Sequence, residues 1–155
     1  MPNLTFRRLE RPQESSNGLS RSARSHVDFE IDGHSLFIMT NAADSDLVGV
    51  LGWAVSGRDD EAIDQFLLKR PTDLPDQRQP VFVCPECGDI ACGAITLRLR
   101  LEGDAVVWED LAYENGFDES VTDRSSFEYL AFSFPRDQYE RAFEELRQSL
   151  KRGAA

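Results

Sequence analysis

Three cysteines within nine residues are the side chains best suited to chemistry in this sequence: Cys84, Cys87 and Cys92. Cys84 and Cys87 are separated by Pro-Glu and followed by a glycine, which is the spacing of half a zinc knuckle. Structural zinc takes four ligands in a tetrahedron, so Cys92 would be the third ligand. The candidates for the fourth ligand are His26, His34, Asp89 and Glu86. His34, at a predicted hairpin turn, is our choice, although the second cysteine pair of a complete knuckle is missing.

The same cysteines also allow a dithiol that shuttles electrons. A strand followed by Cys-Pro-x-Cys occurs in thioredoxin-like enzymes, where a helix N-terminus stabilises the first thiolate. Here the continuation is GDIACGAITL (88–97), in which two glycines and an alternating β-branched run predict a turn and a strand. We therefore do not expect the helix that would stabilise a thiolate.

A third interpretation is purely structural. Free cysteine is among the most buried residue types, and it packs as a small apolar side chain. Gly88 and Gly93 permit backbone turns that are closed to other residues, and Asp89 can cap exposed N–H groups locally. The three interpretations predict bound zinc, a thiol with a low pKa, or ordinary packed thiols.

Four motifs carry a resemblance to known proteins: CPECGDIACGAIT (84–96), VVWEDLAYEN (106–115), EIDG (30–33) and LGW (51–53). On these motifs the chain resembles an uncharacterised family of small bacterial proteins, some of which carry the label "oxidoreductase" without support. The resemblance covers about residues 27–146 and implies a common fold, but it brings no catalytic residues and no cofactor. Cys87 and Cys92 match the family pattern better than Cys84 does, which counts against a three-cysteine metal site.

A second group of side chains suits binding rather than chemistry. Between Glu102 and Asp123 there are eight acidic residues and no Lys or Arg, interleaved with aromatic residues. Aromatic side chains supply contact area in interfaces, and acidic rims steer basic partners. Our candidate partner-binding residues are Trp108, Glu109, Asp110, Tyr113, Glu114, Phe117 and Asp118. The alternative is a solvated loop beside a strand with Trp108 in the core, because charge runs usually face water.

Hydrolytic chemistry finds little support in the sequence. A Ser or Cys nucleophile needs a positioned base, usually histidine. The chain has two histidines, His26 at the edge of a predicted tail and His34 in a predicted hairpin, and we expect both on the surface. The sequence also has no phosphate-binding loop, no dinucleotide fingerprint and no HExxH motif.

The elements that must position these groups follow from hydrophobic periodicity and turn residues. Residues 27–38 predict a β-hairpin that turns at Asp32-Gly33. Residues 58–70 predict an amphipathic helix with an acidic start and a basic end, stopped by Pro71. Further strands are predicted at 81–83, 93–101, 105–110 and 126–134, and a last helix begins at Pro135. The sum is an α+β fold, a mostly antiparallel sheet with two helices.

The length of 155 residues suits a single domain, which we place at residues 27–152. Residues 1–26 contain five arginines, two glutamates, five serines and one glycine, a composition that cannot bury enough surface to order itself. We therefore predict a mobile basic tail at 1–26, in which Leu-Thr-Phe near the start could add a short strand. The tail carries +3 of the net −11, which leaves −14 for the domain.

The acidic charge restricts the class of partner. A net charge of −11 argues against a nucleic-acid binder, which must neutralise phosphates, and against an anionic membrane surface. It would steer the protein toward a basic partner, although solubility alone also explains it. No apolar stretch approaches the ~20 residues that span a bilayer, and the N-terminus lacks a signal-like apolar core. We therefore expect a cytoplasmic protein.

Together these patterns favour a non-catalytic, acidic protein-binding module. In its concrete form this would be an immunity-like or antitoxin-like inhibitor of a basic protein. The alternative is a small zinc-based or thiol-based protein centred on residues 84–92.

Overall fold

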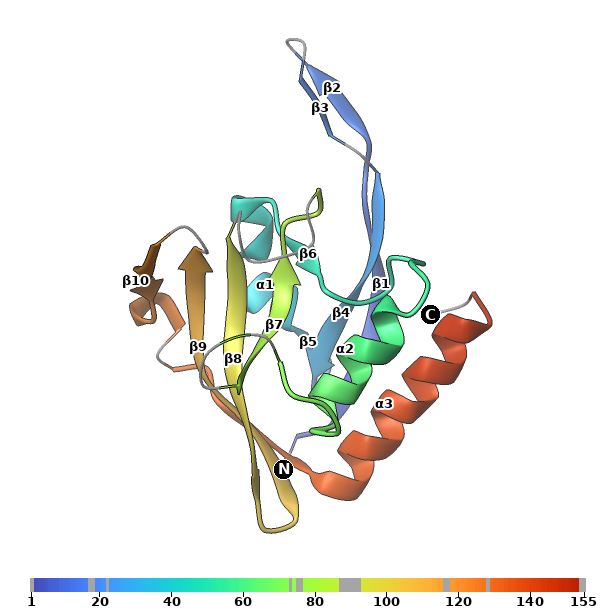
Figure 1. Cartoon of the computed structure of the whole chain (residues 1–155), viewed down its shortest axis with the longest axis vertical. Helices are drawn as coiled ribbons and strands as arrows, with labels where there is room; N and C mark the ends of the chain where they lie inside the picture. The colour runs from blue at the N-terminus through green and yellow to red at the C-terminus, as the bar shows by residue number, and fades with distance from the viewer. Residues whose placement is uncertain are drawn as a thin grey trace.

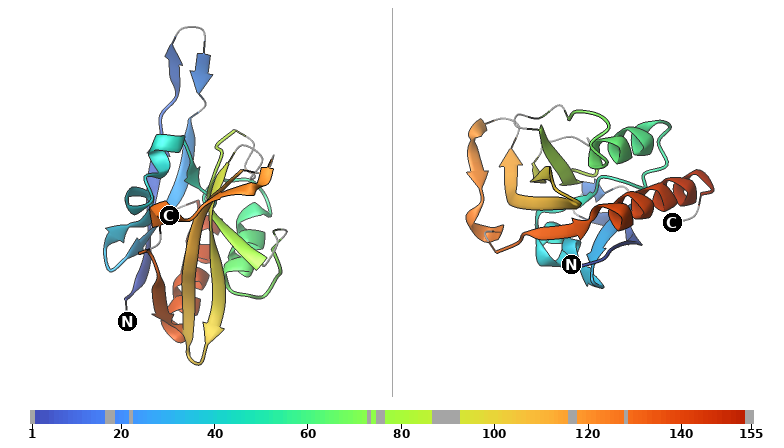
Figure 2. Two further views of the ribbon diagram at one scale, coloured as in Figure 1. Left: turned by 90° about the vertical axis from the view of Figure 1, so that its left-hand side faces the viewer. Right: turned by 90° about the horizontal axis from the view of Figure 1, so that it is seen from below.

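The computed structural model of the chain describes residues 2–16, 19–21, 23–72, 74, 77–86, 93–115, 118–127 and 129–153. They form a single α+β domain with two antiparallel sheets, one of them curled into a half-barrel, and three α-helices, two of them substantial (Figure 1). The predicted fold class is confirmed. The two long helices lie side by side on one flank, and a two-stranded arm projects from the body (Figures 1 and 2).

The larger sheet has the strand order β10-β9-β8-β7-β6, and β11 also pairs with β9. Its strands are β6 (Val48–Gly49), β7 (Arg78–Val83), β8 (Ala94–Glu102), β9 (Ala105–Asn115), β10 (Asp118–Asp123) and β11 (Phe132–Pro135). In β8 the alternating residues Ile95, Leu97 and Leu99 are buried, but Leu101 is 44% exposed because it lies next to the hairpin turn.

The smaller sheet has the order β1-β4-β5 and comes from the N-terminal part of the chain. Strand β1 (Leu4–Arg11) pairs antiparallel with β4 (Arg24–Ile31) along its whole length, and Leu4 is fully buried. This strand falls within the segment that composition predicted as a tail, and it extends the short strand expected near the start. Beyond it, β2 (Glu14–Ser16) and β3 (Leu19–Arg21) pair as a ribbon and continue the arm (Figure 1).

The predicted hairpin at residues 27–38 forms, but its second strand is shorter than expected. Asp32 and Gly33 both adopt positive φ (50° and 81°), which a two-residue turn requires. The second strand, β5, is only His34–Ser35, because the Ser35 hydroxyl accepts the Ile38 N–H and starts helix α1 (Leu36–Met39). A 3₁₀ turn, η1 (Ala42–Ser45), follows α1.

The two long helices agree with the sequence in position but not in every boundary. Helix α2 (Arg58–Phe66) ends before the predicted Arg70, because Leu68 adopts a positive φ of 61°. Helix α3 (Arg136–Lys151) begins one residue after the predicted start at Pro135, which instead ends β11 opposite Ala105. The stretch 126–134, predicted as one strand, instead holds the end of a 3₁₀ turn, η4 (Ser125–Phe127), and most of β11. Asp123 causes this, since its carboxylate accepts hydrogen bonds from Ser125 and Ser126.

The core between the sheets and the long helices is an aromatic cluster. Phe66 of α2 stacks on Phe143 of α3 at 5.0 Å between ring centres. Tyr139 donates its hydroxyl hydrogen to the Phe66 carbonyl at 2.7 Å, and burial raises the pKa of this phenol. Further members of the cluster are Phe29, Phe82, Trp108 and Phe134. Because Phe29 lies on β4, this cluster joins the smaller sheet to the larger one.

Candidate partner-binding surface

Trp108 lies in the core rather than on a partner-binding surface. Its side chain is fully buried, and its Nε1–H donates to the Tyr139 hydroxyl at 3.2 Å. Phe29 and Phe134 contact the ring edge-on at 5.6 and 5.1 Å between centroids. An enclosed ring cannot contact a partner, so we remove Trp108 from the proposed surface. The alternative interpretation of this segment, a solvated loop beside a strand with Trp108 in the core, gave the position of Trp108 correctly.

Asp110 and Glu114 come together around a buried arginine that sequence reasoning missed. Arg78 on β7 is 5% exposed, and its Nη1 lies 2.9 Å from Oδ2 of Asp110. Its Nε donates to the Thr96 hydroxyl at 3.0 Å, and that hydroxyl donates to Glu114 at 2.8 Å. The Nη2 atom of Arg78 donates to the carbonyl of Thr96 at 3.2 Å. This network is charge-assisted and links a buried guanidinium to two carboxylates that stay partly exposed.

A β-bulge in β9 aims Asp110 at Arg78. Between the pairs Thr96↔Ala112 and Arg98↔Glu109 the register shifts, so β9 has one residue more than β8. Asp110 takes the left-handed conformation at φ 53°, which a β-bulge permits. The alternating pattern of the sequence gave no sign of this extra residue.

The other predicted surface residues divide between internal contacts and the undescribed part of the chain. Glu109 accepts a hydrogen bond from Arg100 at 2.7 Å, and Asp110 accepts a second one from Arg124 at 2.8 Å. Tyr113 is half-buried, and its ring lies against Gly93, where an added Cβ would meet the phenol oxygen at 2.2 Å. Asp118 begins β10, opposite Asn115. Phe117 lies outside the described residues. Within the part of the chain that the structure describes, four of the eight carboxylates in the run, Glu102, Glu109, Asp110 and Glu114, are therefore paired with arginines of β7, β8 or the residue just after the run.

The cysteine stretch is described only at its start. Cys84 is half-buried and directly follows β7, whereas Cys87 and Cys92 lie outside the described residues. The turn after Cys84 contacts the base of the arm: Arg24 donates to the Pro85 carbonyl at 3.0 Å, and Arg11 forms an ion pair with Glu86 at 3.6 Å. His34 is exposed on β5. Within the described ranges, no three His, Cys, Asp or Glu side chains are close enough to hold a metal ion.

His26 is a core residue and not the surface histidine that the sequence predicted. It is 1% exposed, and its Nδ1 accepts the Gly49 N–H at 2.9 Å. Burial lowers its pKa to about 4, so the ring is neutral at pH 7. It lines a pocket of about 270 Å³ with Phe37 and Asp46. Its place one residue before the alternating Val27-Phe29-Ile31 pattern could have revealed it as a strand position.

A surface that the sequence analysis overlooked lies around α1. Asp28 is buried under this helix, and its carboxylate accepts hydrogen bonds from the Phe37 N–H at 3.0 Å and from the Ser35 hydroxyl. Burial raises the pKa of Asp28, while these hydrogen bonds oppose the rise. The helix thus fixed presents Ile38, which is 73% exposed. We define the α1 face as Glu30, Asp32, Ile38 and Asp44.

The α1 face has a clear charge signal in the sequence. Residues 27–57 contain five acidic residues and no Lys or Arg. Asp28 is buried, and Asp46 forms a two-pronged pair with Arg11 at 2.9 Å. In the part of the chain that the structure describes, no ion pair to Lys or Arg is seen for Glu30, Asp32 or Asp44. A charge count over this window, set beside the apolar Ile38, would have found the face.

No protein-family model, curated protein or solved structure matches the chain. The resemblance drawn above therefore depends on the sequence motifs alone. Among the helices that the structure describes, none is long and apolar enough to cross a membrane.

Proposed function

We propose that this protein is a non-catalytic binding module that docks a basic protein partner on its α1 face. An inhibitor of the immunity or antitoxin type would have these properties. The observation that carries the proposal is the exposure of Ile38 on a helix fixed from beneath, within a segment that has acidic residues and no Lys or Arg.

An exposed apolar side chain with a charged rim is the usual anatomy of a protein interface. Isolated apolar residues on a surface are common, but interfaces place an apolar anchor at the centre and polar groups around it. Ile38 supplies the anchor. Glu30, Asp32 and Asp44 supply a rim of one sign, which favours Lys and Arg on the partner and raises the association rate.

The rigidity of α1 supports the same role. The helix has only one turn and would not be stable alone in water. The Asp28 carboxylate and the Ser35 hydroxyl accept N–H groups at its start, at Phe37 and Ile38, so the anchor is held before a partner arrives. Such preorganisation reduces the conformational entropy lost on binding.

The histidines fit a binding role better than a catalytic one. The Nδ1 atom of His26 already accepts a backbone hydrogen bond, and its pKa of about 4 makes the ring a weak base. His34 lies exposed on the two-residue strand β5.

The test is to trap the partner at Ile38 and then measure its affinity. A photo-reactive amino acid at position 38 in the native host should crosslink the partner, which is then purified and titrated by calorimetry. Ile38→Ser should weaken binding by at least about tenfold, as expected for a central anchor. Asp44→Lys should weaken binding more at low salt than at high salt, because exposed charges are screened.

Asp104→Lys is the matched control, because it makes the same charge change at the exposed β8–β9 turn. It should leave the affinity nearly unchanged. Equal losses from Asp44→Lys and Asp104→Lys would mean that only net charge matters. That result, or full affinity in Ile38→Ser, would refute the α1 face as the binding site.

A further inference from the structure

Strand β1 is the edge of the smaller sheet, and its outer side offers free backbone groups. The Asp32 N–H donates to the Asn3 carbonyl at 2.9 Å, so the Asn3 carbonyl points toward the side of β1 on which β4 lies. In an antiparallel pair this direction alternates from residue to residue. Leu4, Phe6, Arg8 and Glu10 therefore point their N–H and C=O groups away from β4, toward the open edge.

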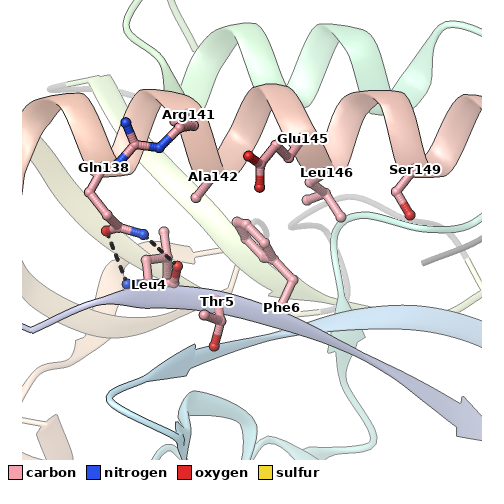
Figure 3. Close-up of a pocket in the computed structure, with 9 residues that line it drawn as sticks. All are labelled: Leu4, Thr5, Phe6, Gln138, Arg141, Ala142, Glu145, Leu146 and Ser149. Carbon is pink, nitrogen blue, oxygen red and sulfur yellow. Dashed lines mark hydrogen bonds between the residues drawn. The ribbon is translucent and has the colours of Figure 1, made fainter.

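The side chain of Gln138 on α3 shows how this edge can be paired. The Leu4 N–H donates to Oε1 of Gln138 at 3.3 Å, and Nε2 of Gln138 donates to the Leu4 carbonyl at 3.0 Å (Figure 3). The primary amide thus supplies the acceptor and the donor that a neighbouring strand would supply. In the described part of the chain, no backbone partner is seen for the outward groups of Phe6 and Arg8.

A groove of about 300 Å³ continues from Gln138 between β1 and α3. Its apolar lining includes Phe6, Ala142 and Leu146, and Figure 3 shows Phe6 rising from β1 toward the helix. Glu145 and Ser149 lie above it on α3. The groove therefore places an apolar wall beside unpaired strand backbone, the arrangement used in β-strand addition.

We propose that the outer edge of β1 takes up an extended segment of a partner protein as an additional strand. The segment pairs its backbone with Phe6 and Arg8. Its alternate side chains on the groove side are apolar and pack beside Phe6. The side chains on the other face are acidic, because exposed Arg7 lies on that face of β1. Arg7 lies on the same side of the smaller sheet as Glu30 of the α1 face, but the backbone groups at the edge of β1 bind without Ile38.

The probe is a short synthetic peptide of alternating valine and aspartate, titrated into the ¹⁵N-labelled full chain. The amide signals of Phe6 and Arg8 should shift, and their hydrogen exchange should slow. Thr5 and Arg7 should keep their exchange rates, because their N–H groups already face β4. Ile38→Ser, the variant that tests the α1 face, should bind the peptide as the wild type does.

Two controls decide the outcome without relying on a protein variant. The same peptide, N-methylated where its N–H groups would face β1, should bind at least about tenfold more weakly, because two or more hydrogen bonds are lost. A valine–lysine peptide should also bind more weakly. Equal affinity of the N-methylated peptide, shifts confined to residues outside β1, or no binding would each overturn the proposal. In addition, Ala142→Arg should reduce binding by filling the groove.

Discussion

The guanidinium of Arg78 lies 2.9 Å from the carboxylate of Asp110, within the larger sheet and almost out of contact with water. This pair engages Asp110 within the protein, so the acidic run at 102–123 offers less unpaired charge than its charge count indicates. Arg78 lies outside the run in sequence, and the antiparallel pairing of β7, β8 and β9 brings it to the centre. A count along the chain cannot register a cation that arrives from another strand.

Removal of Arg78 should destabilise the fold strongly. Arg78→Met keeps the apolar stem of the side chain but removes the guanidinium shared by Thr96, Glu114 and Asp110. Asp110 is 34% exposed and keeps its pair with Arg124, so the loss comes mainly from the buried hydrogen bonds to the Thr96 hydroxyl and carbonyl and should be about 1–3 kcal/mol. Urea unfolding, followed by circular dichroism, measures this loss. Arg100→Met removes an exposed arginine from the neighbouring strand and should lower the free energy of unfolding much less. Equal losses for the two variants would show that the Arg78 network stabilises the fold no more than an exposed ion pair does.

Acid should destabilise the protein through His26 as the pH falls below 6.5. Burial lowers the pKa of this ring from 6.5 to about 4, so the unfolded chain binds the proton more readily than the folded chain. The contribution of neutral His26 is complete above pH 6.5 and decreases as the pH falls toward 4. The shift corresponds to a loss of about 3 kcal/mol across this window.

The measurement for His26 is the free energy of unfolding at several pH values between 4 and 7.5. His26→Asn retains an acceptor for the Gly49 N–H but does not titrate in this range. The difference in stability between wild type and variant should therefore change with pH in favour of the variant as the pH falls. A difference independent of pH would contradict the assignment of the acid sensitivity to His26.

The sequence predicted the fold class because its strongest patterns are local. The alternation from Val27 to Ile31 and the apolar stripe of α3 each determine an element without help from the rest of the chain. Strand β1 was predicted only at Leu-Thr-Phe, because Arg7 and Arg8 interrupt its alternation. In the structure Arg8 occupies an inward position and reaches Ser25 on β4, so its charge is compatible with a strand.

The candidate site was harder to predict, because burial depends on pairing across the chain. Trp108 and Ile38 are the clearest cases: the residue chosen for the surface is enclosed, and an apolar residue of a predicted strand is exposed. Trp108 is enclosed because Tyr139 and Phe134 pack on it, and Ile38 is exposed because the cap at Ser35 starts α1 where a strand was predicted. Neither has a signature in hydrophobic periodicity.

Gly93 should tolerate no side chain while Tyr113 is present. Its φ of +104° already disfavours other residues, and an added Cβ would meet the Tyr113 hydroxyl oxygen at 2.2 Å. Gly93→Ala should therefore destabilise the protein more than Gly103→Ala, which has φ +58° and open space around it. We expect about 1–2 kcal/mol for Gly103→Ala, from the backbone alone. Tyr113→Phe should partly rescue Gly93→Ala in thermal unfolding; no rescue would mean that the phenol oxygen is not the obstacle.

The cysteine stretch should behave as a packed turn rather than a metal or redox centre. The turn after Cys84 is tied to the arm, and Glu86, one of the possible zinc ligands, pairs with Arg11 instead. Elemental analysis of tag-free protein should therefore find less than one equivalent of zinc, and the thiols Cys84, Cys87 and Cys92 should react slowly as ordinary thiols. Their pKa values should not lie well below the usual ~8.5 for free cysteine.

One equivalent of zinc with shielded thiols, lost together with the fold on chelation, would instead establish the site that joins the three cysteines to His34. A thiolate that titrates well below 8.5 and forms a reversible disulfide would establish the dithiol.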